Sequence, residues 1–360
     1  MLKKNILIDE IRPGMILGAD AINSRGQTVV PKSTVLSLRH LSKLKTFGIK
    51  SVSVSIPDHL ATPEELASSG VSENPLKSTP EYKEFRRTIL YIANMLSETF
   101  DRIVTDPGAP VKYDEILSSI DELVTKAGSS LRVLELLQCS RDFEDSIYAH
   151  SVSVTLISRV IGKKSQFNDT QLHELQLAAL FHDIGKLGIP DEILYKTEPL
   201  AEEDRAIIEN HATEGYQLLI KTELPEFVAL AALHHHEHYD GSGYPHGISG
   251  QHIPLYARYV AVADVYNAMT SKRPYRDEIC PFEVIKGFED DGFQHYDAAA
   301  LLPFLSNLAD SQIGSTVTLS NGQTGKIIML NERLTRPIIQ VGTNFIDLMR
   351  RPDLEIVKIL

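Results

Sequence analysis

Apolar residues recur at spacings of three and four along the middle of this chain, which is the pattern of helices that bury one face. One such stretch covers residues 81–104, with apolar positions at Phe85, Ile89, Ile92, Leu96, Phe100 and Ile103. We interpret this stripe as a core-facing surface rather than as a dimer seam, and a homodimer stays open. Further helices are predicted over residues 143–161, 168–181 and 254–270. Asp169 or Thr170 is expected to cap the helix over 168–181.

The two ends of the chain instead contain runs that are typical of short strands. Residues 48–54 alternate apolar and polar side chains after a helical run over 33–47. Near the C-terminus, β-rich runs cover residues 315–319, 326–330 and 337–341. Asn321-Gly322 between the first two is a hairpin signal.

These patterns divide the chain into four parts. Residues 57–80 are rich in proline and small polar residues, and we interpret them as a linker. We therefore predict a small α+β module over 1–56, the linker over 57–80, a helical domain over 81–310 and a small β-rich appendage over 311–360. The fold class is mainly α.

Composition excludes several classes of protein. Of the 360 residues, 42% are hydrophobic and 23% are charged, which is an ordinary globular balance. The formal net charge of -12 argues against a broad surface for duplex nucleic acid. Cys139 and Cys280 form neither a disulfide framework nor a zinc-type pair. No stretch reaches the roughly 18 apolar residues of a membrane span, and no secretory signal follows Met1. We expect a cytoplasmic protein without a membrane span.

Histidine and aspartate are concentrated in two motifs of the helical region. Residues 181–190 read Phe181-His182-Asp183-Ile184-Gly185-Lys186-Leu187-Gly188-Ile189-Pro190. Residues 234–245 read His234-His235-His236-Glu237-His238-Tyr239-Asp240-Gly241-Ser242-Gly243-Tyr244-Pro245. His150, His211 and Asp264 lie around and between them. Imidazole and carboxylate are ligands that first-row metals prefer, so the set predicts a metal-dependent hydrolase.

Each of these residues, taken alone, has a plainer explanation. His150 and His211 are compatible with core or surface positions, and residues 234–238 with a solvated loop. Asp264 lies in an apolar helix, where a carboxylate is costly unless it is coordinated or paired, for example with Arg258 or Arg273. If all of these plainer explanations held, the chain would carry this many metal-type ligands only by chance. We assign structural or surface roles to His40, His59, His173, His246, His252 and His295. For His234 and His238 both a structural role and a ligand role stay open, because these two residues flank the His235-His236 pair.

The spacing of the motifs sets conditions on the local structure. Asp183 has two oxygens and is suited to bridging two cations, as in two-metal hydrolases. The adjacent His235 and His236 reach one cluster only if the backbone there ends a helix or turns. The sequence Asp240-Gly241-Ser242-Gly243 supplies turn chemistry directly afterwards.

At this point the two motifs resemble those of the HD-GYP phosphodiesterases, a branch of the HD metallohydrolase superfamily. The resemblance covers about residues 110–305. It implies an all-helical domain that hydrolyses cyclic di-GMP, a bacterial second messenger, to pGpG, with a further cut to GMP left open. It implies attack of a metal-bridging hydroxide on phosphorus. The residues on the family's ligand positions are His150, His182, Asp183, His211, His235, His236 and Asp264.

The resemblance also assigns roles beyond the metal ligands. Lys186, with Asp183, falls on a catalytic position, and Lys186, Arg273 and Arg276 fall on phosphate-binding positions. Gly241, Gly243, Tyr244 and Pro245 are expected to shape a loop beside the site, and protein partners such as diguanylate cyclases are expected at this loop.

One departure concerns the number of metal ions. Three-metal members carry a glutamate four residues before the first ligand histidine, and this chain has Ser146 there. We therefore expect two divalent ions, with iron or manganese favoured over zinc.

Three other functions stay open at this stage. One is a phosphodiesterase that prefers cyclic GMP-AMP. Another is a catalytically weak module that binds the nucleotide and signals through protein contacts. The last is a different HD-type hydrolase that acts on nucleoside phosphates.

Overall fold

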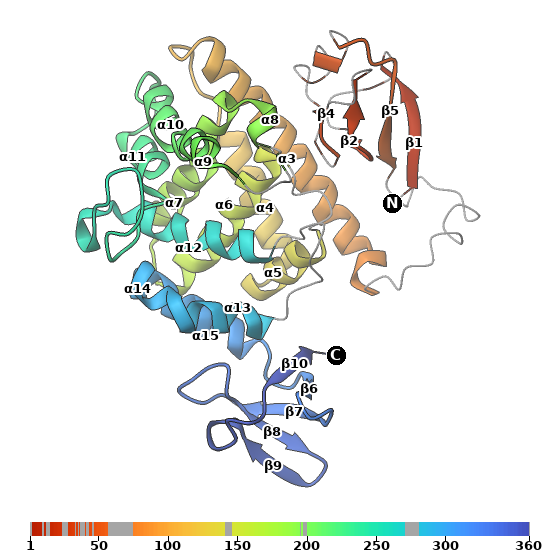
Figure 1. Ribbon diagram of the computed structural model, residues 1–360, viewed down its shortest axis with the longest axis vertical. Helices are drawn as coiled ribbons and strands as arrows, with labels where there is room; N and C mark the ends of the chain where they lie inside the picture. Colours follow the sequence, from red (N-terminus) through yellow and green to blue (C-terminus); the bar gives the residue numbers. More distant parts are fainter. Residues whose placement is uncertain are drawn as a thin grey trace.

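The computed structural model shows a helical bundle flanked by two small groups of strands (Figure 1). It describes residues 2–8, 11, 15–23, 28–32, 34, 36, 40, 43–44, 47–56, 75–140, 146–194, 196, 200–270 and 281–359. The mainly α prediction is confirmed. No helix within these ranges has the length and apolar character that crossing a membrane requires.

The N-terminal strands form a small sheet with its own core. Strands β1 (Leu2–Leu7), β5 (Ser51–Ile56) and β2 (Ile16–Leu17) pair antiparallel in the order β1-β5-β2. Strands β3 (Ala21–Ile22) and β4 (Thr28–Val30) form a separate hairpin. Leu17, Leu36, Leu44 and Val54 are buried in this module, whereas Ile16 packs into the helical core. The predicted strand near residue 51 is confirmed, and most of the predicted helical run over 33–47 lies outside the described residues.

The helical region is built around α6, whose residues are buried on almost every side. It packs against α7, α12, α3 and α15. The α-helices are α3 (Pro80–Thr105), α4 (Asp114–Ala127), α5 (Ser130–Cys139), α6 (Ile147–Lys164), α7 (Asp169–Phe181), α8 (Asp191–Leu194), α9 (Glu202–Glu209), α10 (His211–Leu219), α11 (Glu226–His234), α12 (Leu255–Thr270), α13 (Pro281–Gly287), α14 (Phe293–His295) and α15 (Ala298–Asp310). Short 3-10 helices η3 (Pro75–Ser78), η5 (Ile184–Gly188) and η6 (Gly250–His252) and the π-helical turn η7 (Phe288–Gly292) connect them.

The apolar stripe of α3 faces the interior of the chain. Phe85, Ile89, Leu96 and Phe100 are all buried in the main core. This confirms the core-facing interpretation of the stripe, so the stripe is not available as a dimer seam.

Two predicted helix starts are wrong by one to four residues, and capping explains both. Helix α7 is capped by Asn168, not by Asp169 or Thr170. The Asn168 side chain accepts from the backbone of Gln171, and the Gln171 side chain accepts from the backbone of Asn168. Helix α6 begins at Ile147 rather than at residue 143, because the Ser146 hydroxyl accepts from the backbone N–H of Ala149 at 3.1 Å.

The C-terminal residues form a five-stranded antiparallel sheet in the order β10-β6-β7-β8-β9. Its strands are β6 (Thr316–Leu319), β7 (Thr324–Met329), β8 (Ile338–Val341), β9 (Asn344–Asp347) and β10 (Ile356–Ile359). The 3-10 helix η8 (Leu348–Arg350) lies between β9 and β10. The predicted hairpin is present, with Gly322 at φ +83°. Strands β9 and β10 were not predicted, because each has four residues of mixed polarity. Val317, Ile327 and Ile339 join the main hydrophobic core.

Candidate metal centre

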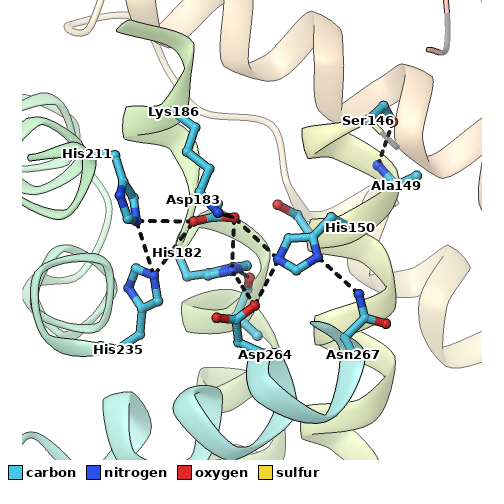
Figure 2. Close-up of polar contacts among 12 residues, drawn as sticks. Ser146, Ala149, His150, His182, Asp183, Lys186, His211, His235, Asp264 and Asn267 are labelled. Atoms are coloured by element: carbon cyan, nitrogen blue, oxygen red, sulfur yellow. Dashed lines mark hydrogen bonds and ion pairs between the residues drawn. The ribbon is translucent and has the colours of Figure 1, made fainter. Parts of the chain in front are cut away.

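Seven side chains converge at one point inside the helical bundle. Figure 2 labels six of them, namely His150, His182, Asp183, His211, His235 and Asp264. The seven form two groups. Within each group, the candidate ligand atoms all lie within 4.8 Å of one another. The first group contains Asp183, His211, His235 and His236, and the second contains His150, His182 and Asp264. These are the seven residues that the sequence placed on ligand positions.

Helix ends bring the histidines to this point. His182 is the C-terminal cap of α7, and His235 is the C-terminal cap of α11. Because α11 ends at His234, the next two residues leave the helical path, and the rings of His235 and His236 lie 4.0 Å apart by their centroids. The helix terminus that this pair requires is therefore present.

Asp183 lies between the two groups, and each of its oxygens faces one of them. Oδ1 lies 3.4 Å from Nε2 of His211 and 3.6 Å from Nε2 of His235. Oδ2 lies 3.3 Å from Nε2 of His150 and 3.4 Å from Nε2 of His182. The side chain is 1% exposed. This is the arrangement that a carboxylate bridging two cations requires.

Three of the imidazoles have their tautomer fixed by the backbone. In each, Nδ1 lies against a carbonyl oxygen three residues earlier: His182 with Ala179 at 2.8 Å, His211 with Ile208 at 2.6 Å, and His235 with Ala232 at 2.9 Å. A carbonyl oxygen only accepts, so Nδ1 carries the proton and Nε2 presents a lone pair. Histidines that ligate metals are commonly oriented by such a bond from the other ring nitrogen.

Two buried polar atoms at this point have no hydrogen-bond partner among the described residues. They are Nε2 of His182 and Oδ1 of Asp183. Buried polar groups are normally satisfied, so orphaned acceptors that face one another need an explanation. Divalent cations held by these nitrogen and oxygen atoms would satisfy both of them, and the donor set therefore fits a metal.

The centre is negatively charged at its two carboxylates. Burial acts to raise the pKa of Asp183, but the charges of His182 and Lys186 outweigh burial and hold this pKa well below its usual range. The pKa of Asp264 is likewise lowered, because its bond to His150 outweighs burial. Burial lowers the pKa of His150, but hydrogen bonds to Asp183 and Asp264 raise it to about 9.

Asn267 is a functional neighbour that the sequence analysis missed. Its side-chain amide lies 3.0 Å from Nδ1 of His150 (Figure 2). The amide nitrogen Nδ2 faces the ring and donates to Nδ1, so Asn267 fixes the orientation of His150 with Nε2 toward the two carboxylates. The available signal was its position on α12, three residues after Asp264 and on the same face.

The alternative in which Asp264 pairs with Arg258 is not observed. Arg258 instead pairs with Asp297, which lies just before α15, and both side chains are at most 10% exposed. Asp264 faces His150, with Oδ1 at 3.0 Å from Nε2.

Lys186 adds a positive charge at the edge of the centre. Its Nζ lies 2.6 Å from Oδ2 of Asp183, and its side chain is 21% exposed. The ammonium group is thus beside the acidic pair yet reachable from solvent. Arg273 and Arg276, the other predicted phosphate-binding residues, lie outside the described residues.

Gly185 lets the segment after Asp183 pack directly on α10. A Cβ built on Gly185 would lie 2.0 Å from the carbonyl oxygen of His211 and 2.5 Å from the backbone nitrogen of Gly215. The contact joins η5, which follows one ligand, to the helix that begins with another. The spacing between Asp183 and His211 therefore depends on the absence of a side chain here.

The loop after His236 folds back over that ligand. The ring of Tyr244 stacks on His236 with centroids 4.7 Å apart and planes 25° apart, and its backbone N–H donates to the His236 carbonyl at 3.1 Å. A Cβ on Gly243 would lie 2.4 Å from the same carbonyl oxygen. Glu237, with 2% exposure, accepts from the backbone N–H of His246 at 2.8 Å. Gly241 has φ +85°, which permits the turn, and Pro245 follows Tyr244.

His234 and His238 lie outside the seven-residue centre. His234 groups with Glu237 and His246, and His238 groups with Asp240 and His295. His238 stacks on His295 with ring centroids 4.5 Å apart. His59 lies outside the described residues.

Comparison with known proteins identifies relatives of the helical region. The family described as HD domain matches residues 116–300, more than half of the chain. A cyclic di-GMP phosphodiesterase of Pseudomonas aeruginosa is 28% identical over 316 residues, which cover 84% of this chain and 75% of that protein. A cyclic di-GMP phosphodiesterase of Thermotoga maritima is 40% identical over 41% of this chain and 40% of its own length. A 3'3'-cGAMP-specific phosphodiesterase of Vibrio cholerae is 38% identical over 38% of this chain and 32% of its own length.

The extent of these matches differs. The chain spans three quarters of the Pseudomonas aeruginosa relative but less than half of the other two proteins. The long match includes residues outside the HD domain, and the two shorter matches have the higher identity.

Proposed function

This chain belongs to the HD-domain family, and on that premise we propose that it is a metal-dependent phosphodiesterase that hydrolyses cyclic di-GMP. The observation that carries the proposal is Asp183, whose two oxygens face two separate groups of buried ligand atoms. Two of the relatives described above are named cyclic di-GMP phosphodiesterases, and one of them aligns with most of this chain. The expected product is pGpG, and a further cut to GMP is a separate question.

We propose that the centre holds two divalent ions, iron or manganese. His211, His235 and His236 would hold one, His150, His182 and Asp264 the other, and Asp183 would contact both. When bound, such ions generate a nucleophile from water near neutral pH and offset charge on the phosphoryl oxygens. Mixed imidazole and carboxylate ligands suit iron and manganese.

Ser146 supports two ions rather than three. A third ion needs a ligand one turn before His150, and Ser146 is there with its hydroxyl engaged as the N-terminal cap of α6. A capping hydroxyl is a poor ligand, because its oxygen already accepts a hydrogen bond from the backbone. Metal analysis of purified protein should therefore give two ions per chain.

The protein side chains have distinct parts in this proposal. Asp183 and Asp264 stay ionised, because their pKa values are lowered. Lys186 places a positive charge beside them, where it can meet a nonbridging phosphate oxygen as a point charge. Tyr244 holds the ring of His236 in place by stacking on it, and burial raises the pKa of its hydroxyl, so that this group stays protonated.

A second substrate, cyclic GMP-AMP, is favoured by one observation. A relative with 38% identity is named as specific for 3'3'-cGAMP. The two substrates carry the same phosphodiester linkage and differ in one base, so the metal centre does not distinguish them. Kinetics with both nucleotides decide this question.

The cellular setting and protein partners remain predictions. We propose a cytoplasmic location, which is supported by the low cysteine content of two residues in 360. A homodimer and a protein partner at the loop near Tyr244 also stay predictions.

The test is turnover by the full chain with defined metals. The protein is purified anaerobically, loaded with Fe(II) or Mn(II), and assayed with cyclic di-GMP and cyclic GMP-AMP by chromatography. Asp183→Ala is compared with Asp169→Ala, which removes an exposed carboxylate at the opposite end of α7. We expect pGpG from wild type and Asp169→Ala and none from Asp183→Ala. Wild-type protein that holds two metals yet cleaves neither nucleotide would refute the proposal.

A further inference from the structure

A cavity of about 140 Å³ lies between the N-terminal module and the helical region. This volume is far above the roughly 10–15 Å³ that a single water needs, so the cavity has room for a polyatomic group. Three segments line it. The lining residues are Thr34, His40 and Lys43 of the module, Ser146, Ile147 and Tyr148 at the start of α6, and Lys186, Leu187, Ile189 and Leu194 after the metal centre.

The charged side chains of this cavity are all basic. Lys43 and Lys186 line it together with His40, and no aspartate or glutamate is among its lining residues in the described part of the chain. The chain as a whole carries 48 acidic against 36 basic side chains. Two lysines and a histidine around one cavity make a locally basic lining, which suits an anion.

The cavity shares a residue with the metal centre. Lys186 lines the cavity, and its Nζ lies 2.6 Å from Oδ2 of Asp183. Ser146 lies one turn before His150 on the other wall (Figure 2). An anion in the cavity would therefore lie next to a group bound at the metal centre.

We propose that Lys43 and His40 of the N-terminal module complete a second phosphate site for the cyclic dinucleotide. This inference rests on the proposed function. A cyclic dinucleotide carries two phosphodiester groups, and only one is cleaved at a time. The metal centre meets the phosphate that reacts, and the cavity meets the other one. The N-terminal module is thus part of the substrate-binding surface and sets substrate affinity.

The test compares Lys43→Ala with Lys50→Ala in the full chain. Both changes remove one lysine charge from the same module, but Lys50 is exposed and does not line the cavity. Each protein is assayed with cyclic di-GMP and with bis(p-nitrophenyl) phosphate, which has a single phosphodiester. Removing one charged hydrogen-bonding partner should raise KM for cyclic di-GMP about tenfold in Lys43→Ala. The value of kcat, and turnover of bis(p-nitrophenyl) phosphate, should stay at the wild-type level, and Lys43→Arg should restore most of the affinity.

The other outcomes separate the two proposals. Wild-type protein that cleaves bis(p-nitrophenyl) phosphate but not a cyclic dinucleotide would refute the proposed function and, with it, this site. Active wild type with the same KM in Lys43→Ala, or with equal effects of Lys43→Ala and Lys50→Ala, would refute this site alone. Inhibition by inorganic phosphate that weakens in Lys43→Ala, without any change in KM, would assign the cavity to free phosphate and overturn the inference.

Discussion

Replacing Gly185 by alanine tests whether the metal centre depends on close packing of η5 (Ile184–Gly188) against α10. The added methyl group would meet the backbone oxygen of His211 at 2.0 Å and the backbone nitrogen of Gly215 at 2.5 Å. Both are main-chain atoms inside the bundle, so no flexible side chain can move aside. The two segments must separate by about 1 Å or more to reach ordinary contact distance.

Overpacking of this kind costs about 1–3 kcal/mol, and a clash with backbone belongs at the upper end. Gly188 in the same 3-10 helix provides the control, because a Cβ there meets no atom within 4 Å and its φ is not positive. Gly188→Ala should be neutral or stabilise by a few tenths of a kcal/mol. For Gly185→Ala, a loss of about 3 kcal/mol corresponds to a fall in Tm of about 6 °C or more.

The assay is thermal and urea unfolding of both variants, with metal titration of the folded proteins. Separation of η5 from α10 moves Asp183 away from His211, so Gly185→Ala should also lose metal affinity while Gly188→Ala keeps it. If Gly185→Ala unfolds at the wild-type temperature and binds metal like wild type, then the packing argument is wrong.

Three further changes test the centre itself. Saturating Mn(II) at 100 times Kd should stabilise wild type by about 2.7 kcal/mol, and Asp183→Asn should lose this gain in thermal scans with and without metal. Asn267→Leu removes the group that orients His150 and should weaken metal binding by about tenfold or more, measured by titration; unchanged affinity would contradict that role. Tyr244→Phe should keep wild-type turnover, whereas Tyr244→Ala should lower metal occupancy by freeing the His236 ring; a large loss of kcat in Tyr244→Phe would instead indicate a catalytic hydroxyl.

The sequence predicted α6, α7 and α12, which position His150, His182 and Asp264, from their apolar residues. It made no separate prediction for α10 and α11, which position His211 and His235. The starts of α6 and α7 were less predictable. Asn168 and Ser146 each cap the N-terminus of a helix through a side-chain hydrogen bond, and the pattern of apolar residues does not show where that bond forms. The strands β9 and β10 were missed because four residues of mixed polarity carry little periodicity.

Four residues of the centre, His182, Asp183, His235 and His236, lie in the two motifs, and the family resemblance added His150, His211 and Asp264. Their neighbours were not predictable in the same way. Asn267 is a common helix residue, and only the fold shows that its amide faces His150. Arg258 was an alternative partner for Asp264, but it pairs instead with Asp297 from the segment before α15. Pairs that are distant in sequence depend on the tertiary fold, which local patterns do not encode.

The contacts of Nδ1 with carbonyls three residues earlier have a consequence for how this centre can change. The carbonyl groups near a helix end lack partners within the helix, and the imidazoles of His182 and His235 satisfy them at the ends of α7 and α11. Each ring thus serves the backbone through one nitrogen and faces the centre through the other. Replacing such a histidine removes a candidate ligand and also leaves a carbonyl at the helix end without its partner. The composition of the centre and the ends of α7 and α11 are therefore physically coupled.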